Sequence, residues 1–204
     1  MLQSYPFKPT KSEVFKTGKT NLEKRSREYL LPGEVDRLLT ASKVVRYGQR
    51  DSTLILLSFR HGLRVTEAIN LTWSDIDFGG GSIHINRLKR GISGRHPLRK
   101  PELIALHKLR TAGQIIESPY LFNSQQGKPL SSRYINMMVA AAGKVAELGF
   151  SVHPHMLRHA CGYFLASKGI DTRAIAEYLG HSSLEHTYRY TAIAPGRFND
   201  FWSD

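Results

Sequence analysis

The amino-acid sequence predicts a mainly α fold with one small three-stranded antiparallel β-sheet (α+β). Apolar residues recur at helical spacing through most of the chain after residue 28, and capping residues or glycines bound these stretches. Only between Trp73 and Leu98 does the apolar spacing change to two, which is typical of strands. With 204 residues, 41% of them hydrophobic, the chain is long enough for one domain with a substantial core.

The first 27 residues are basic and lack apolar periodicity. Seven lysines and arginines stand there against Glu13 and Glu23. Such a segment indicates a flexible arm. We expect this arm over residues 1–27 and the folded domain over 28–204, with no separate domain between them. A merely solvated tail is as good a reading of the arm as an interaction segment.

Three helices are expected at the start of the folded domain. The first opens at residues 31–34, the second follows Asp51 and ends at Gly62, and the third is capped by Thr66 or a neighbour. Arg64 then lies at a helix N-terminus, where free backbone N–H groups favour an anion. Three residues later, Glu67 can orient the guanidinium of Arg64 from behind, without contacting the anion itself.

The stretch with period two predicts a β-hairpin with a basic turn. Strands are expected around Ile76, over 83–88 as the middle strand, and over 95–98. Residues 82–100 carry six lysines and arginines and no acid. A solvated turn is the simple reading, but the unrelieved charge favours a turn that reaches a nucleic acid.

Further helices are expected around 103–106, 134–139, 154–168 and 171–180. Pro154 suits the first turn of a helix, and Gly169 suits its end. In that helix His155 and Arg158 share one face. A separate apolar stripe, expected to face the core, consists of Leu157, Cys161, Phe164 and Leu165.

Overall composition points to a polyanionic partner. The net charge is +12 and the isoelectric point is near 10.0, more than solubility requires. No apolar run is long enough to span a membrane, and the N-terminus has no secretory signal pattern. A single cysteine, Cys161, fits a reducing cytoplasm. A nucleic acid, either DNA or RNA, is therefore the expected partner, and the cytoplasm is the expected compartment.

Six side chains make a candidate phosphoryl-transfer site: Arg64, Lys89, His155, Arg158, His181 and Tyr190. Two guanidiniums can hold the non-bridging oxygens of a phosphodiester, and a phenol can attack phosphorus once its proton is removed. Histidine suits proton transfer near neutral pH. This chemistry needs no metal or other cofactor. A metal cluster of His153, His159 and His186 with His155 is disfavoured, because no cysteine or carboxylate stands at ligand spacing. Helix-capping or core roles are expected for the first three.

Three motifs carry a resemblance to the tyrosine recombinase (phage integrase) family. The stretch 61–68 with 71–77 resembles its first arginine motif, 155–159 resembles its His-x-x-Arg motif, and 179–184 with Tyr190 resembles its closing motif. In the closing motif Tyr190 stands nine positions after His181. Within that family the sequence is similar to the short invertases that flip a fimbrial promoter segment and so cause phase variation.

The resemblance implies a role for each residue of the site. Arg64 and Arg158 would clamp the phosphate, with Glu67 behind them. Lys89 would protonate the 5′-oxygen, His155 would be the acid/base partner and His181 a hydrogen-bond donor to the phosphate. Tyr190 would form a 3′-phosphotyrosine. The fold would be the family's catalytic domain, acting as a homotetramer on double-stranded DNA with inverted-repeat sites. The resemblance also implies a place on the bacterial nucleoid, with DNA-bending accessory proteins as possible partners.

Other basic residues are expected to contact the DNA backbone: Arg60, Arg87, Arg90, Arg95, Lys24 and Arg25. The choice of Lys89 over Arg90 as the acid is open. Tyr188 competes with Tyr190 as nucleophile, but helical geometry turns it to another face, and we expect it to be packed.

Two alternatives to a recombinase remain at this point. Residues 171–182 also resemble a helix-turn-helix, which favours a DNA-binding regulator without chemistry. A DNA-relaxing enzyme of the type IB topoisomerase kind would use the same chemistry without strand exchange. A regulator has no need of two arginines 94 positions apart together with a spaced tyrosine.

Overall fold

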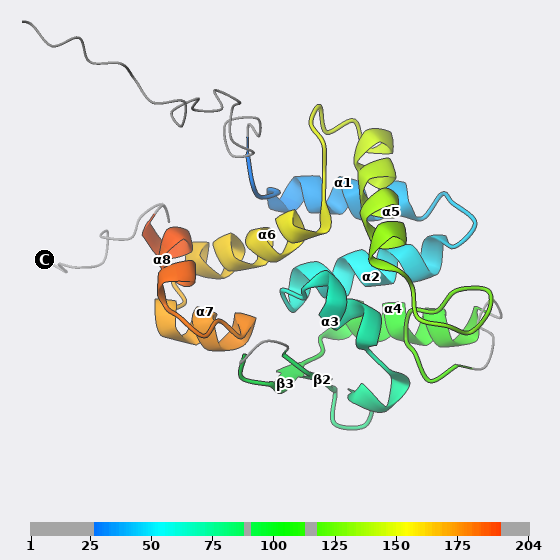
Figure 1. The fold of residues 1–204 in the computed structure, drawn as a ribbon, viewed down its shortest axis with the longest axis horizontal. Coiled ribbons are helices and arrows are strands. Elements are labelled where there is room, and N and C mark those ends of the chain that lie inside the picture. The colour runs from blue at the N-terminus through cyan, green and yellow to red at the C-terminus, as the bar shows by residue number, and fades with distance from the viewer. Residues whose placement is uncertain (1–26, 88–90, 113–117, 193–204) are drawn as a thin grey trace, which may run out of the picture.

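The computed structural model describes residues 27–87, 91–112 and 118–192. Within this part the chain forms eight α-helices, one short 3-10 helix and a three-stranded sheet (Figure 1). The helices are α1 (Pro32–Ser42), α2 (Gly48–Arg60), α3 (Val65–Asn70), α4 (Lys100–Thr111), α5 (Ser132–Val145), α6 (Pro154–Ser167), α7 (Thr172–Leu179) and α8 (Glu185–Ala192). The strands are β1 (Ile76–Asp77), β2 (Ser82–Ile85) and β3 (Gly94–Pro97), and η1 spans Trp73–Asp75. The predicted fold class is confirmed.

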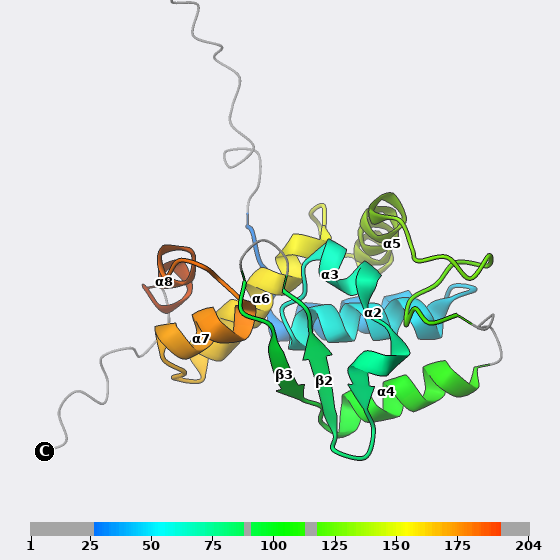
Figure 2. The ribbon, with the colours of Figure 1, turned by 60° about the horizontal axis from the view of Figure 1, so that its bottom comes forward.

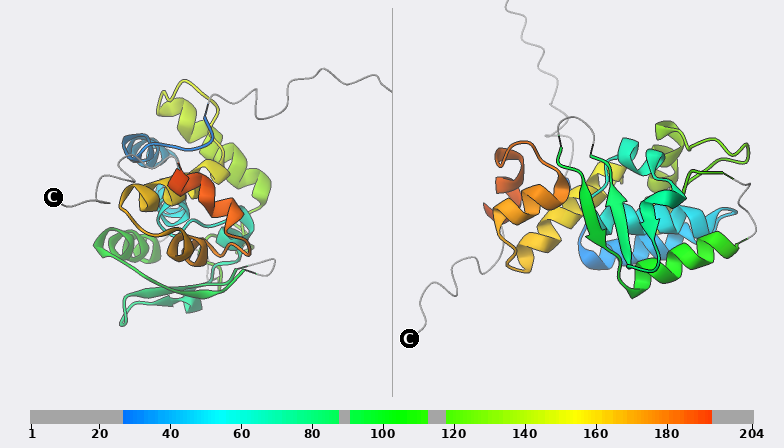
Figure 3. Two further views of the ribbon diagram at one scale, coloured as in Figure 1. Left: turned by 90° about the vertical axis from the view of Figure 1, so that its left-hand side faces the viewer. Right: turned by 90° about the horizontal axis from the view of Figure 1, so that it is seen from below.

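Helix α6 connects two apolar clusters. In the larger cluster α1 packs against α2 and α5, and α2 packs against α4 and α6. The smaller cluster consists of Cys161, Ala166, Ile175, Leu179 and Tyr190. Figure 3 shows α7 and α8 gathered at one end of α6. The start of α6 therefore belongs to the main core, while its second half supports the unit formed by α7 and α8.

The sheet is a simple antiparallel meander in the order β1-β2-β3. In its register Ile83 stands opposite both Ile76 and His96. Ile83 and Ile85 are fully buried, as their alternation predicts. Figure 2 shows the end of β2 and the beginning of β3 lying near α6 and α7. The middle strand ends at Ile85, whereas the sequence predicted an end at 88.

Capping residues or glycines stand where the sequence predicts them, after α2 and α6 and at both ends of α7. Gly62 (φ +58°) follows α2 and Gly169 (φ +75°) follows α6. The carboxylate of Asp171 accepts from the backbone N–H groups of Arg173 and Ala174 at the start of α7. Gly180 (φ +65°) ends that helix in the left-handed conformation. These glycines are needed because other residues adopt a positive φ at a cost.

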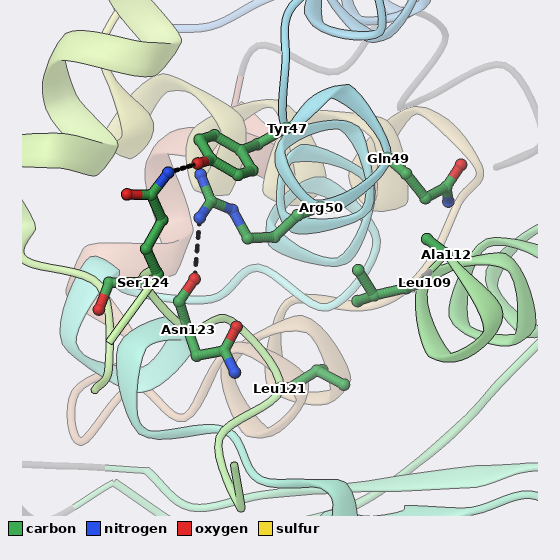
Figure 4. A pocket seen from close by; sticks show the side chains of 9 residues that line it. Tyr47, Gln49, Arg50, Leu109, Ala112, Leu121, Asn123 and Ser124 are labelled. Carbon is green, nitrogen blue, oxygen red and sulfur yellow. Dashed lines mark hydrogen bonds between the residues drawn. The ribbon is translucent and has the colours of Figure 1, made fainter. Parts of the chain in front are cut away.

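The prediction that α2 follows Asp51 is wrong, since the helix already begins at Gly48. Asp51 is not a cap because its carboxylate lies in the interior, where it binds Arg50 and accepts from the hydroxyl of Tyr134. Figure 4 shows the guanidinium of Arg50 beside the ring of Tyr47, donating to the carbonyl of Asn123. Through its hydrogen bond to Asn123, Arg50 anchors the start of α2 to the loop before α5.

None of the helices in the described part of the chain has the length and apolarity needed to cross a lipid bilayer.

Candidate active site

Arg158 lies at the centre of the site and is only 1% exposed. One guanidinium nitrogen donates to the carbonyl of Gly62 at 2.5 Å and the other to that of Leu179 at 2.7 Å. Arg158 therefore joins the turn between α2 and α3 to the end of α7. Burial, with the nearby charges of Arg64 and Arg87, lowers its pKa to about 10, so the guanidinium is charged at neutral pH.

Arg64 occupies the N-cap position of α3, so it lies at a helix N-terminus as predicted, and the cap that was expected at Thr66 or a neighbour is not Thr66. Its guanidinium donates to Glu67 Oε1 at 2.6 Å and to the carbonyl of Gly180 at 3.4 Å. Its backbone N–H donates to Glu67 Oε2 at 2.9 Å. The expected contact between Arg64 and Glu67 is therefore present. With its side chain 30% exposed, Arg64 can meet a phosphate from solvent.

The carboxylate of Glu67 is shared by several donors. Its Oε2 accepts from Arg87 at 2.7 Å and lies 3.9 Å from Arg158. Burial alone would raise the pKa of this carboxyl, but the backbone hydrogen bond from Arg64 and the charge of Arg87 outweigh it and lower the pKa. Glu67 is thus an ionised carboxylate inside a group of three guanidiniums.

Arg87 does not occupy the place predicted for it. We expected a contact with the DNA backbone, but the residue is only 7% exposed and its guanidinium points inward. Besides Glu67, it donates to the carbonyls of Gly62, His61 and Tyr178. A DNA contact is excluded in this conformation because the guanidinium is surrounded by protein acceptors.

Tyr190 projects from α8 into the smaller cluster and is only 1% exposed. Its hydroxyl lies 2.9 Å from Nδ1 of His159. Burial raises the pKa of Tyr190 to about 12, although Arg158 opposes the shift. Burial likewise lowers the pKa of His159 to about 3. Both groups are therefore neutral near pH 7, and one hydrogen bond joins them.

His159 is the site residue that sequence reasoning missed, since we expected a capping or core role. Its position held the signal, because His159 directly follows Arg158 and lies one helical turn beyond His155. The rings of His155 and His159 meet edge to face at 4.4 Å. His155 itself is exposed.

His181 begins the loop between α7 and α8. Its Nδ1 lies 2.6 Å from the hydroxyl of Thr187, and its ring stacks at 6.3 Å on that of Tyr190. Burial and the charge of Arg158 lower its pKa to about 3. When Nδ1 accepts from the hydroxyl of Thr187, the neutral ring carries its proton on Nε2, and this tautomer suits a hydrogen-bond donor.

The remaining predicted residues either lie outside the described part of the chain or lie away from Arg158. Lys89, Arg90, Lys24 and Arg25 lie outside the described residues. Arg95 is exposed on β3, 3.6 Å from Asp77. Arg60 is partly exposed and pairs with Glu102 at 3.3 Å. Tyr188 is 57% exposed, so the prediction that it is packed is wrong.

Chemically, the site offers two bound guanidiniums and two neutral imidazoles next to a phenol. Arg64 and Arg158 both reach the α7 end, at the carbonyls of Gly180 and Leu179, directly before His181. Within the described residues, no three histidine, cysteine or acidic side chains gather to hold a metal ion. Such a set can bind a phosphodiester and supply a nucleophile to it.

The chain is similar to known proteins both in sequence and in structure. Over 187 residues the chain is 41% identical to the type 1 fimbriae regulatory protein FimB of Escherichia coli K12, covering 90% of this chain and 94% of FimB. It is 41% identical over 180 residues to FimE of the same strain, covering 86% and 91% respectively. The crystal structure of XerA recombinase superposes with a TM-score of 0.73 at 26% identity, covering 85% of this chain and 63% of XerA.

The fold and these relatives define a site-specific recombinase of the tyrosine type. The phage integrase family model matches residues 28–197, and the chain belongs to that family. The predicted resemblance is confirmed, and a regulator without chemistry is disfavoured.

Replacing Gly162 with alanine should displace Tyr190. A Cβ at this position would lie 2.6–2.8 Å from Cε2, Cδ2 and Cζ of the tyrosine ring, closer than carbon atoms approach. Despite the better helix propensity of alanine, we expect Gly162→Ala to lower the free energy of unfolding by about 1–3 kcal/mol. Denaturant unfolding measures this. Gly33→Ala, where a Cβ meets nothing within 4 Å, is the control. Equal stability of the two variants would contradict the packing described.

Stability should fall between pH 7 and pH 5. His159 and His181 stay neutral in the folded protein, with pKa values near 3, while in the unfolded chain they bind protons near pH 6.5. Their stabilisation is therefore complete above about pH 6.5 and is lost as the pH falls, by up to about 1.4 kcal/mol per histidine and pH unit.

Urea unfolding at several pH values tests this dependence. His159→Leu should show a shallower loss than the parent protein. His107→Gln, on the exposed face of α4, controls for removal of a histidine. An unchanged slope in His159→Leu would mean that His159 is already protonated in the folded state.

Proposed function

We propose that this recombinase cleaves and rejoins DNA strands through a 3′-phosphotyrosyl intermediate on Tyr190. The observation that carries the proposal is the meeting of Arg64 and Arg158 at the end of α7, beside His181 and with Tyr190 in the next helix. Family membership supports the same reading.

In the proposed reaction Arg64 and Arg158 bind the non-bridging oxygens of the scissile phosphate. The phenolic oxygen of Tyr190 forms a bond to phosphorus while its proton passes to a base, for which His155 is the proposed group. The bond from phosphorus to the 5′-oxygen breaks, and Lys89 protonates that oxygen. His181 donates a hydrogen bond to the phosphate. Rejoining reverses these steps, so no cofactor or metal is needed.

The buried phenol adds one requirement to this scheme. Because Tyr190 is only 1% exposed and bonded to His159, its hydroxyl has to leave this partner before it meets a phosphate. The proposed reaction therefore includes a displacement of the Tyr190 ring or of α8 when DNA binds.

We further propose that the protein inverts or integrates a DNA segment flanked by inverted-repeat sites. Inversion is favoured by the similarity to FimB and FimE, whose names describe regulators of type 1 fimbriae. Strand exchange between two sites calls for a homotetramer on DNA. The place of action is the cytoplasm, on the nucleoid, with DNA-bending proteins as accessory partners.

Tyr190→Phe should abolish covalent attachment to DNA, because it removes the attacking oxygen. Incubation with a suicide duplex, whose cleaved end cannot be rejoined, followed by SDS gel electrophoresis detects the adduct. DNA affinity should stay within about 3-fold, since the clamp is intact. The exposed Tyr188→Phe is the matched control and should form the adduct normally. An adduct in Tyr190→Phe would assign the nucleophile to another residue.

DNA binding should depend steeply on salt. With about six proposed phosphate contacts, the affinity should fall about 10³-fold between 50 and 200 mM salt, as contacts release counterions. Arg95→Ala should lower the slope of log K against log salt by about one unit. Fluorescence anisotropy at several salt concentrations measures both. A flat salt dependence would refute the basic contact surface.

A further inference from the structure

Arg87 combines a charged side chain with a fully interior position. It follows β2 in the sequence, yet its guanidinium reaches three separate segments of the chain. It donates to His61 and Gly62 in the turn after α2, to Glu67 in α3, and to Tyr178 in α7. Its backbone N–H donates to the hydroxyl of Ser93 at 2.9 Å, which closes the loop between β2 and β3.

Each segment that Arg87 contacts also carries a residue of the proposed site. The carbonyl of Gly62 accepts from both Arg87 and Arg158. The carboxylate of Glu67 accepts from both Arg87 and Arg64. The two phosphate-binding arginines therefore share acceptors with Arg87, and the position of each depends on where Arg87 holds those acceptors.

The aliphatic part of Arg87 packs against the residue before His181. A Cβ added to Gly180 would lie 2.6 Å from Cγ and 2.7 Å from Cδ of Arg87. Together with the hydrogen bond to the carbonyl of Tyr178, this contact fixes the end of α7. The backbone that presents His181 thus rests on Arg87.

We propose that Arg87 is a positioning residue of the recombinase: it aligns Arg64, Arg158 and His181 for one phosphate without touching DNA. This inference rests on the proposed function. Lysine cannot replace it, because a single ammonium group cannot reach acceptors on three segments as the planar guanidinium does. Arg87 also leaves the cluster of three arginines and one carboxylate with a surplus of positive charge, which an entering phosphodiester neutralises.

Arg87→Met tests the proposal against Arg50→Met as a matched control. Arg50 is also a buried arginine, 8% exposed, which pairs with Asp51 and donates to a backbone carbonyl (Figure 4). Its hydrogen bonds and ion pair among the described residues involve none of the site. Both substitutions remove a buried guanidinium and should lower the melting temperature. Single-turnover cleavage of the suicide duplex at saturating DNA, at a temperature where each variant is folded, separates them.

We expect Arg87→Met to slow cleavage about 100-fold, the cost of misplacing charged groups at a transition state, and Arg50→Met to stay within about 3-fold. Arg87→Lys, which keeps the charge, should remain at least about 10-fold slow and serves if Arg87→Met does not fold. Wild-type cleavage by either Arg87 variant, or an equal loss in Arg50→Met, would overturn the proposal.

A second measurement reports only on how Arg64 and Arg158 contact the phosphate. A methylphosphonate at the scissile position removes the charge that Arg64 and Arg158 contact. The ratio of cleavage rates on phosphate and methylphosphonate should shrink about 10-fold in Arg87→Met and stay unchanged in Arg50→Met, because only the first disturbs the clamp. An unchanged ratio in both variants would reduce Arg87 to a structural role. If the parent protein itself forms no adduct, the proposed function fails instead.

Discussion

The site depends on one buried carboxylate. Glu67 lies between Arg64, Arg87 and Arg158, and without it three guanidiniums would share an interior space with no counter-charge. Buried charges are tolerated only when they are paired and hydrogen-bonded. Glu67 meets this requirement and also accepts the backbone N–H at the start of α3. The same carboxylate thus caps the start of α3, pairs the arginines and sets the distance between them.

The buried arginines and the proposed nucleophile are held in different ways. Arg158 and Glu67 belong to segments packed on the larger core, where backbone carbonyls fix the guanidiniums. Tyr190 belongs to the smaller cluster and is kept neutral by burial and by its hydrogen bond to His159. A neutral, covered phenol cannot attack phosphorus, so the free protein holds its proposed nucleophile in an unreactive form.

Much of the fold could be read from the sequence because its signals are local. Pro154, Gly169, Asp171 and Gly180 each act within one turn of backbone, and the structure uses all four as predicted. Alternation around Ile83 likewise identified the sheet. Asp51 misled because a carboxylate before an apolar run resembles a cap, while its true partners, Arg50 and Tyr134, are set by the tertiary fold.

For the site, spacing and motifs identified which residues come together, but not which of them are buried and which are exposed. Arg87 stands in a basic stretch, so charge alone assigned it to the DNA surface, whereas only the fold brings Glu67 and three carbonyls to its guanidinium. Tyr188 and Tyr190 are two residues apart, yet one is exposed and the other covered, because helix geometry directs them to different faces.

The position of His159 follows from the same helix geometry and explains why α6 connects both clusters. Arg158 and His159 are consecutive on α6, so their side chains leave the helix about 100° apart. One reaches the carbonyls of Gly62 and Leu179, and the other reaches the hydroxyl of Tyr190. A single rigid helix therefore sets the distance between the proposed phosphate clamp and the stored phenol. Any motion that carries Tyr190 to the phosphate has to come from its own ring or from α8, because α6 is held by both clusters.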